Sequence, residues 1–177
     1  RAAAWEQSSR RTLPAGLRLV LQPFNLLDPQ DVADLAAAVA TAGAGAVTIL
    51  DTLNRAAPEA DENSSADMGR IVEAAKELQS LTGGLVVLVH HSGKDASRGL
   101  RGHSSLYAAL DAVIAVSREG ERRTWTNAAA QGGKAKDGAE GHAHAFRLEV
   151  VDMGDDDDGE AITSCVIAPD ESPQDVT

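Results

Sequence analysis

A short, mostly apolar segment that ends in an aspartate constrains the fold of this chain more than any other feature. Residues 47–50 read Val-Thr-Ile-Leu, and Asp51 follows them directly. An apolar run of this kind is typical of a central parallel strand whose two faces are both covered by helices. A carboxylate at the carboxyl end of such a strand faces the crevice where open α/β sheets bind ligands. We therefore expect a strand that ends at Asp51 and a binding site beside it.

The rest of the chain first alternates between strand and helix. Apolar runs predict further strands at residues 17–22, 85–89 and 111–116, and helical spacing predicts helices at residues 32–42, 67–81 and 104–110. This order is the signature of a parallel α/β sheet with right-handed crossovers. Beyond residue 122 the pattern changes to alternation, which predicts antiparallel strands at the sheet edge over residues 123–129, 145–153 and 161–167. We expect one domain over residues 1–168 and a disordered acidic tail over residues 169–177.

Composition narrows the class of protein. No stretch reaches the 18 or so apolar residues of a membrane span. The net charge of −11 argues against broad nonspecific binding of nucleic acid, although it allows a local basic patch. The single cysteine, Cys165, excludes an internal disulfide and fits a cytoplasmic location. The first residues, Arg1 to Glu6, resemble the last turns of a helix already under way, so we expect upstream sequence to be missing.

Asp51 has two interpretations. In P-loop NTPases an aspartate at this place holds Mg²⁺ against the nucleotide phosphates. The alternative is a carboxylate that caps the turn after the strand, which is common at strand ends. The phosphate-binding loop that should accompany the metal site, G-x-x-x-x-G-K-[ST], occurs nowhere in the 177 residues.

Two histidines, His90 and His91, follow the next apolar strand along the chain. Adjacent residues of a strand point to opposite faces, so this pair does not readily ligate one zinc ion. The alternative to a functional role is a histidine that is simply satisfied in the crevice. A single histidine beside Asp51 is well suited to hydrogen-bond a terminal phosphate, and we expect His90 to do so.

Two glycine-rich segments carry cations. The first segment has no glutamate and contains three cations, Lys94, Arg98 and Arg101. It is either a solvated loop or a basic loop that contacts nucleic-acid phosphates. Lys134 and Lys136 lie in a second segment, which is either an ordinary hairpin tip or a finger presented to a phosphate on a neighbouring subunit.

Taken in order, these motifs resemble the RecA-like P-loop ATPase domain of hexameric replicative helicases, most closely the RepA-like ATPases of plasmids and phages. The resemblance covers residues 17–151. It rests on the strand ending at Asp51, on Leu88–Ser92, on the segment from Leu100 to Ile114, and on Lys134–Gly141.

The resemblance implies a mostly parallel, helix-flanked α/β core with antiparallel strands added at its C-terminal edge. It implies ATP and Mg²⁺ as cofactors, with Asp51 as the Mg²⁺ residue and His90 as the catalytic sensor of the γ-phosphate. Lys134 and Lys136 would act in trans on the nucleotide of the adjacent subunit. The basic loop, with the three cations named above, would bind single-stranded DNA in the channel of a homo-oligomeric ring, expected to be a hexamer.

Three departures from the family pattern bear on that function. The Walker A loop and the strand with the catalytic glutamate would lie upstream, so the 177 residues alone should be inactive. Lys136 stands where the family has an arginine finger, which keeps the charge but loses the planar fork. The expected function is an ATP-driven DNA helicase motor, and the alternatives are a RecA-type recombination or repair ATPase and a non-catalytic RecA-like oligomerisation module.

Overall fold

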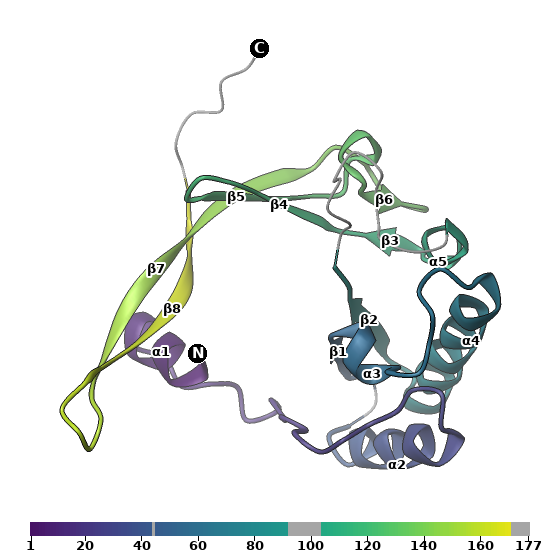
Figure 1. Cartoon of the computed structure of the whole chain (residues 1–177), viewed down its shortest axis with the longest axis horizontal. Coiled ribbons are helices and arrows are strands. Elements are labelled where there is room, and N and C mark those ends of the chain that lie inside the picture. The colour runs from purple at the N-terminus through teal and green to yellow at the C-terminus, as the bar shows by residue number, and fades with distance from the viewer. Residues whose placement is uncertain (44, 92–103, 171–177) are drawn as a thin grey trace. The chain divides into compact units, whose positions relative to one another are not determined.

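A computed structural model describes residues 1–43, 45–91 and 104–170, and the chain divides into two compact units (Figure 1). We call residues Leu19–Val113 the parallel unit, and residues Arg1–Arg18 with Ile114–Thr177 the antiparallel unit. The parallel unit contains α2 (Pro29–Ala40), β1 (Val47–Asp51), α3 (Leu53–Ala56), α4 (Ser65–Thr82), β2 (Leu85–Val89), α5 (Ser104–Ala109) and β3 (Ala112–Val113). The antiparallel unit contains α1 (Ala2–Ser9), β4 (Ala115–Glu119), β5 (Arg122–Thr126), the 3₁₀ helix η2 (Ala129–Gln131), β6 (Lys134–Ala135), β7 (Ala143–Asp155) and β8 (Ala161–Pro169).

In the parallel unit, β1 and β2 form the predicted parallel pair. Their register runs from Val47 opposite Leu85 to Asp51 opposite Val89. Thr48 and Leu50 are buried, whereas Val47 and Ile49 on the other face are 58% and 61% exposed. The expectation that helices cover both faces of this strand is therefore wrong within the described residues, because α2 and α4 pack on one face only.

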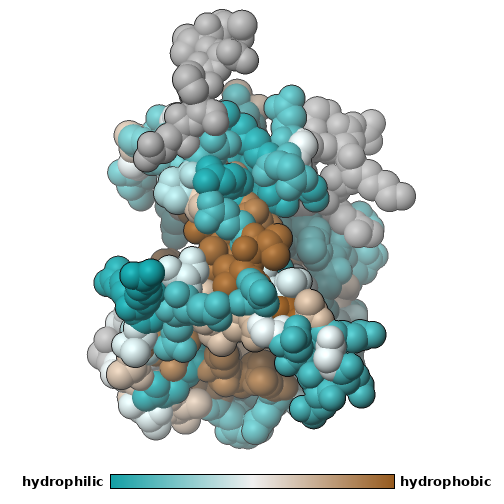
Figure 2. All heavy atoms as spheres, turned by 90° about the vertical axis from the view of Figure 1, so that its left-hand side faces the viewer, coloured by the Kyte–Doolittle hydropathy of each residue, from teal (hydrophilic) through white to brown (hydrophobic). Residues whose placement is uncertain are grey.

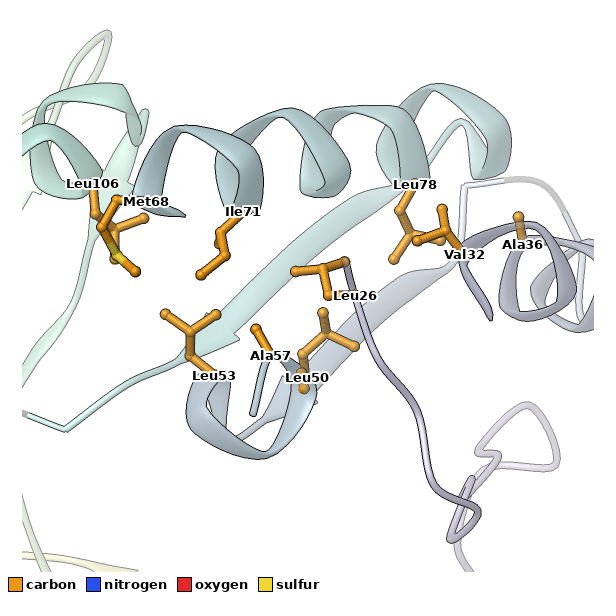
Figure 3. Packing of buried hydrophobic residues seen from close by; sticks show 11 residues of the cluster. Leu26, Val32, Ala36, Leu50, Leu53, Ala57, Met68, Ile71, Leu78 and Leu106 are labelled. Atoms are coloured by element: carbon orange, nitrogen blue, oxygen red, sulfur yellow. The ribbon is translucent and has the colours of Figure 1, made fainter. Parts of the chain in front are cut away.

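The core of the parallel unit lies between this covered face and the helices. Met68, Ile71 and Leu78 recur at helical spacing on α4 and are buried. Figure 3 shows them pointing from α4 toward Leu26 and Leu50. Burying a side chain of this size stabilises the fold by about 1.5–3 kcal/mol, so this cluster accounts for much of the stability of the unit.

Local sequence signals set the ends of these elements. Asp28 caps α2, since its Oδ1 accepts a hydrogen bond from the backbone N–H of Gln30 at 2.8 Å. Ser64 caps α4 in the same way, through the N–H of Asp67 at 3.2 Å. Gly83 ends α4 in the left-handed conformation at φ 64°. Asp and Ser favour the start of a helix because their side-chain oxygens accept from N–H groups that the helix leaves open. Glycine favours the end because it adopts a positive φ without a clash of Cβ.

The antiparallel unit is a four-stranded sheet in the order β4-β5-β7-β8, with α1 packed against β7 and β8. Ala4 of α1 is fully buried, and Gln7 donates from Nε2 to the carbonyl oxygen of Asp152 at 2.8 Å. Val150 and Ile167 stay 75% and 69% exposed. Figure 2 shows that hydrophobic residues, in brown, reach the molecular surface. The predicted antiparallel strands are confirmed, but these described strands hydrogen-bond into a sheet of their own.

Three further expectations need correction. Residues 17–22 form no strand, and Leu21 is 91% exposed; within the described chain no neighbouring strand satisfies their backbone groups. The predicted strand at residues 111–116 is broken at Ile114 into β3 and β4. Pro169 belongs to β8 rather than to a disordered tail, and the Asp170 N–H donates to the carbonyl oxygen of Ala145 at 3.1 Å.

The fold is mixed α/β, as predicted, but the proportion of parallel to antiparallel strands differs from the prediction. Among the described strands, the parallel pair is small and most pairing is antiparallel, so the mostly parallel RecA-like sheet is not what the structure shows. In the part of the chain that the structure covers, no helix is both long and apolar enough to cross a bilayer.

Candidate functional site

Asp51 is the last residue of β1 and lies on its exposed face. The peptide bond between Asp51 and Thr52 is cis. The Asp51 carboxylate makes no hydrogen bond or ion pair with any described residue. Its oxygens are therefore not occupied by the capping contact that was the alternative interpretation.

The chain directly after Asp51 is anchored in the core. Leu53 begins α3 and is only 1% exposed, and the N–H of Ala56 donates to the carbonyl oxygen of Thr52 at 2.9 Å. The carbonyl of Ala56 in turn accepts from the N–H of Leu26 at 2.6 Å. The segment that follows the carboxylate is thus tied to buried residues, which suits a ligand placed on a rigid scaffold.

His90 comes to the same end of the parallel pair. Asp51 is in register with Val89, so His90 is the next residue beyond the partner of Asp51. His90 is half-buried, and His91 is exposed. The structure therefore brings the two predicted catalytic residues to neighbouring strand ends, and their roles stay predictions.

The donor chemistry at Asp51 fits Mg²⁺. This ion prefers oxygen ligands and usually binds through one or two carboxylates, with waters and substrate phosphates completing the shell. An exposed carboxylate that no described residue contacts by a hydrogen bond or ion pair meets that requirement. No group of three or more His, Cys, Asp or Glu among the described residues could hold a metal by itself. Asp51 would thus hold Mg²⁺ only together with phosphate oxygens and water.

Lys134 and Lys136 lie on a closed loop between β5 and β7, residues 127–142, which we call the lysine loop. The backbone N–H of Asn127 donates to the carbonyl oxygen of His142 at 3.1 Å, and the hydroxyl of the buried Thr126 donates to the same oxygen at 2.9 Å. Lys134 is half-buried in β6 and Lys136 is exposed. The loop belongs to the antiparallel unit, whereas Asp51 and His90 belong to the parallel unit.

One residue of this loop was not singled out from the sequence. Asn127 bonds to the returning limb of the lysine loop through its side chain as well as its backbone. The sequence did contain a signal for this residue, because Asn127 follows an alternating strand and precedes a glycine-rich stretch. Asparagine side chains at such places form hydrogen bonds with nearby backbone groups in turns. The predicted DNA-binding residues Lys94, Arg98 and Arg101 lie outside the described residues.

Comparison with known proteins gives one result. A family model described as an AAA domain matches residues 1–97, which is more than half of the 177-residue chain. The match includes Asp51 and His90 and ends before the lysine loop. No curated protein and no solved structure matches the chain.

Proposed function

Because the chain belongs to the AAA domain family, which indicates an ATPase-related role, we propose that it is part of the ATP-hydrolysing motor of a hexameric DNA helicase. The motor would couple ATP hydrolysis to movement along single-stranded DNA during replication. The observation that supports this most is the carboxylate of Asp51, which has no partner among the described residues and lies at the end of a parallel strand within the family match.

In this proposal Asp51 and His90 act on the nucleotide bound by their own subunit. Mg²⁺, when bound, neutralises charge that develops on the phosphates. Asp51 orients the metal. The residues that directly follow it are anchored in the core through the buried Leu53, which keeps the carboxylate in place. His90 donates a hydrogen bond to the terminal phosphate from the neighbouring strand end. Most other phosphate contacts in such ATPases come from the loop G-x-x-x-x-G-K-[ST], which does not occur in the 177 residues.

Lys134 and Lys136 would act on the nucleotide of the adjacent subunit in the ring. Their ammonium groups are compact charges on flexible stems, so they stabilise phosphate charge without the bidentate fork of arginine. The basic loop with Lys94, Arg98 and Arg101 would contact DNA phosphates. In a protein of net charge −11, binding to DNA must depend on such local cations and must weaken as salt rises.

DNA-dependent ATP hydrolysis by the complete gene product tests the proposal. We expect single-stranded DNA to stimulate turnover, and the triple variant Lys94→Ala, Arg98→Ala, Arg101→Ala to lose the stimulation while it keeps basal turnover. The matched control neutralises three exposed cations of the other segments, Arg10, Arg11 and Lys76, and should keep the stimulation.

Three results would contradict parts of the proposal. Stimulation that survives in the triple variant removes the DNA role of the basic loop. Stimulated turnover without unwinding of a forked duplex, together with strand exchange, indicates the recombination or repair alternative. Absence of any ATP turnover in the complete gene product indicates a non-catalytic module.

A further inference from the structure

The returning limb of the lysine loop is held at two points by the side chain of Asn127. Its Nδ2 donates to the carbonyl oxygen of Ala139 at 2.8 Å, and its Oδ1 accepts from the backbone N–H of His142 at 2.9 Å. Because one planar carboxamide makes both bonds, the two points cannot move independently. The limb that follows Lys136 is therefore fixed relative to Asn127.

The outgoing limb packs on the backbone of the same residue. Gly133, which directly precedes Lys134, is buried, and its N–H donates to the carbonyl oxygen of Ala128 at 2.9 Å. A Cβ added to Gly133 would lie 2.2 Å from the carbonyl carbon of Asn127, a distance that no real Cβ contact tolerates. Glycine is thus required for this close approach. The limb before the two lysines and the limb after them both contact Asn127.

We propose that Asn127 is a positioning residue that holds Lys134 and Lys136 in the geometry with which they reach a phosphate group. The inference rests on the proposed function, in which these lysines contact the nucleotide of an adjacent subunit. Fixing the backbone of a residue costs about 1–2 kcal/mol in conformational entropy, so a loop that is already fixed has less to order when the phosphate binds.

Asparagine suits this role because it offers one acceptor and one donor in a single plane. Aspartate would keep the acceptor for His142 but would place an oxygen opposite the carbonyl oxygen of Ala139. Alanine would remove both bonds. We therefore expect the loop to loosen in the order wild type, Asn127→Asp, Asn127→Ala.

Hydrogen exchange of the complete gene product tests the structural half of the inference. In Asn127→Ala, amides of residues 128–142 should exchange about ten-fold faster, since the two side-chain hydrogen bonds that hold the returning limb are lost. Amides of β1 and β2 should keep their wild-type rates, which shows that the variant is folded. The control, Asn63→Ala, removes a 3.3 Å contact to Asp61 in an exposed loop and should leave residues 128–142 unchanged. Unchanged exchange in Asn127→Ala overturns the inference.

ATP turnover tests the functional half. In Asn127→Ala we expect kcat to fall about ten- to a hundred-fold, the cost of a misplaced catalytic group, with a much smaller change in KM. Asn127→Asp should fall in between. The variant that combines Asn127→Ala with Lys134→Ala and Lys136→Ala should be no slower than the variant that lacks only the two lysines, because Asn127 acts through them.

The two possible failures are distinguishable. If Lys136→Ala and Lys134→Ala lower kcat while Asn127→Ala does not, the positioning role of Asn127 is overturned and the proposed function stands. If both lysine variants turn over ATP at the wild-type rate while Asn127→Ala loosens the loop, the lysine role in the proposed function is wrong and the functional half of the inference falls with it.

Discussion

At the scale of single residues, the parallel pair of β1 and β2 depends on a close backbone contact that only glycine allows. Gly84 directly precedes β2, and a Cβ added to it would lie 1.9 Å from the carbonyl oxygen of Ala46, which directly precedes β1. The parallel pair begins at this contact, with Val47 opposite Leu85. The same register sets Asp51 opposite Val89 at the other end of the pair. A side chain at position 84 therefore disturbs the pair that carries the site.

We predict that Gly84→Ala lowers the free energy of unfolding by about 1–3 kcal/mol, the usual cost of forcing extra atoms into a close contact. The matched control is Gly69→Ala. Gly69 lies in α4, where an added Cβ would meet no atom within 4 Å, and alanine there should stabilise the helix by about 0.5–1 kcal/mol. Urea denaturation measures both changes. A Gly84→Ala variant as stable as the wild type would contradict the close contact at Ala46.

At the scale of elements, capping explains why the helices begin where they do. Asp28 accepts from the N–H of Gln30, and Pro29 occupies the first helical position, where its missing N–H costs nothing. Helix α2 then presents Val32 and Ala36 to the core at a spacing of four residues. The cap therefore fixes the register of the helix as well as its start.

We predict that Asp28→Ala destabilises the protein by about 0.5–2 kcal/mol through loss of this cap. Asp34 on the same helix is exposed and accepts only from the side chain of Gln30, at 2.9 Å, so Asp34→Ala should cost less than about 0.5 kcal/mol. Urea denaturation followed by far-ultraviolet circular dichroism measures the difference. Equal effects of the two variants would show that the cap does not set the stability of α2.

The same elements show how far sequence reasoning reaches. The strand that ends at Asp51, the helix after Ser64 and the strand that begins at Leu85 were predictable because apolar spacing and caps agree locally. Residues 17–22 were not, because an apolar run forms a strand only where another strand satisfies its backbone. The break at Ile114 likewise depends on pairing that composition does not encode.

The candidate site was predictable in part for a related reason. Each strand of the parallel pair is five residues long, and their register places His90 just beyond the partner of Asp51. The contacts of Asn127 were not predictable, since its bonds to Ala139 and His142 span 12 and 15 residues of chain. Contacts at such separations emerge only from the folded loop.

At the scale of the whole molecule, the two units differ in how they bury apolar surface. The parallel unit holds the cluster of buried leucines with Met68 and Ile71, and it contains Asp51 and His90 of the family match. The antiparallel unit carries the lysine loop on an extended sheet, with exposed apolar residues such as Val150. The proposed function places Asp51 and His90, and with them the metal, in the parallel unit. Its central claim is that Asp51 orients the Mg²⁺ of an ATPase.

Mg²⁺-dependent ATP turnover of the complete gene product, compared between Asp51→Ala and Asp34→Ala, tests that claim most directly. We predict that Asp51→Ala lowers turnover by about 100-fold or more, because a positioned metal stabilises the transition state by several kcal/mol. Asp34→Ala, an exposed aspartate on α2, should keep wild-type turnover. Equal turnover in the two variants would contradict the claim, because Asp51 would then be an ordinary carboxylate at a strand end.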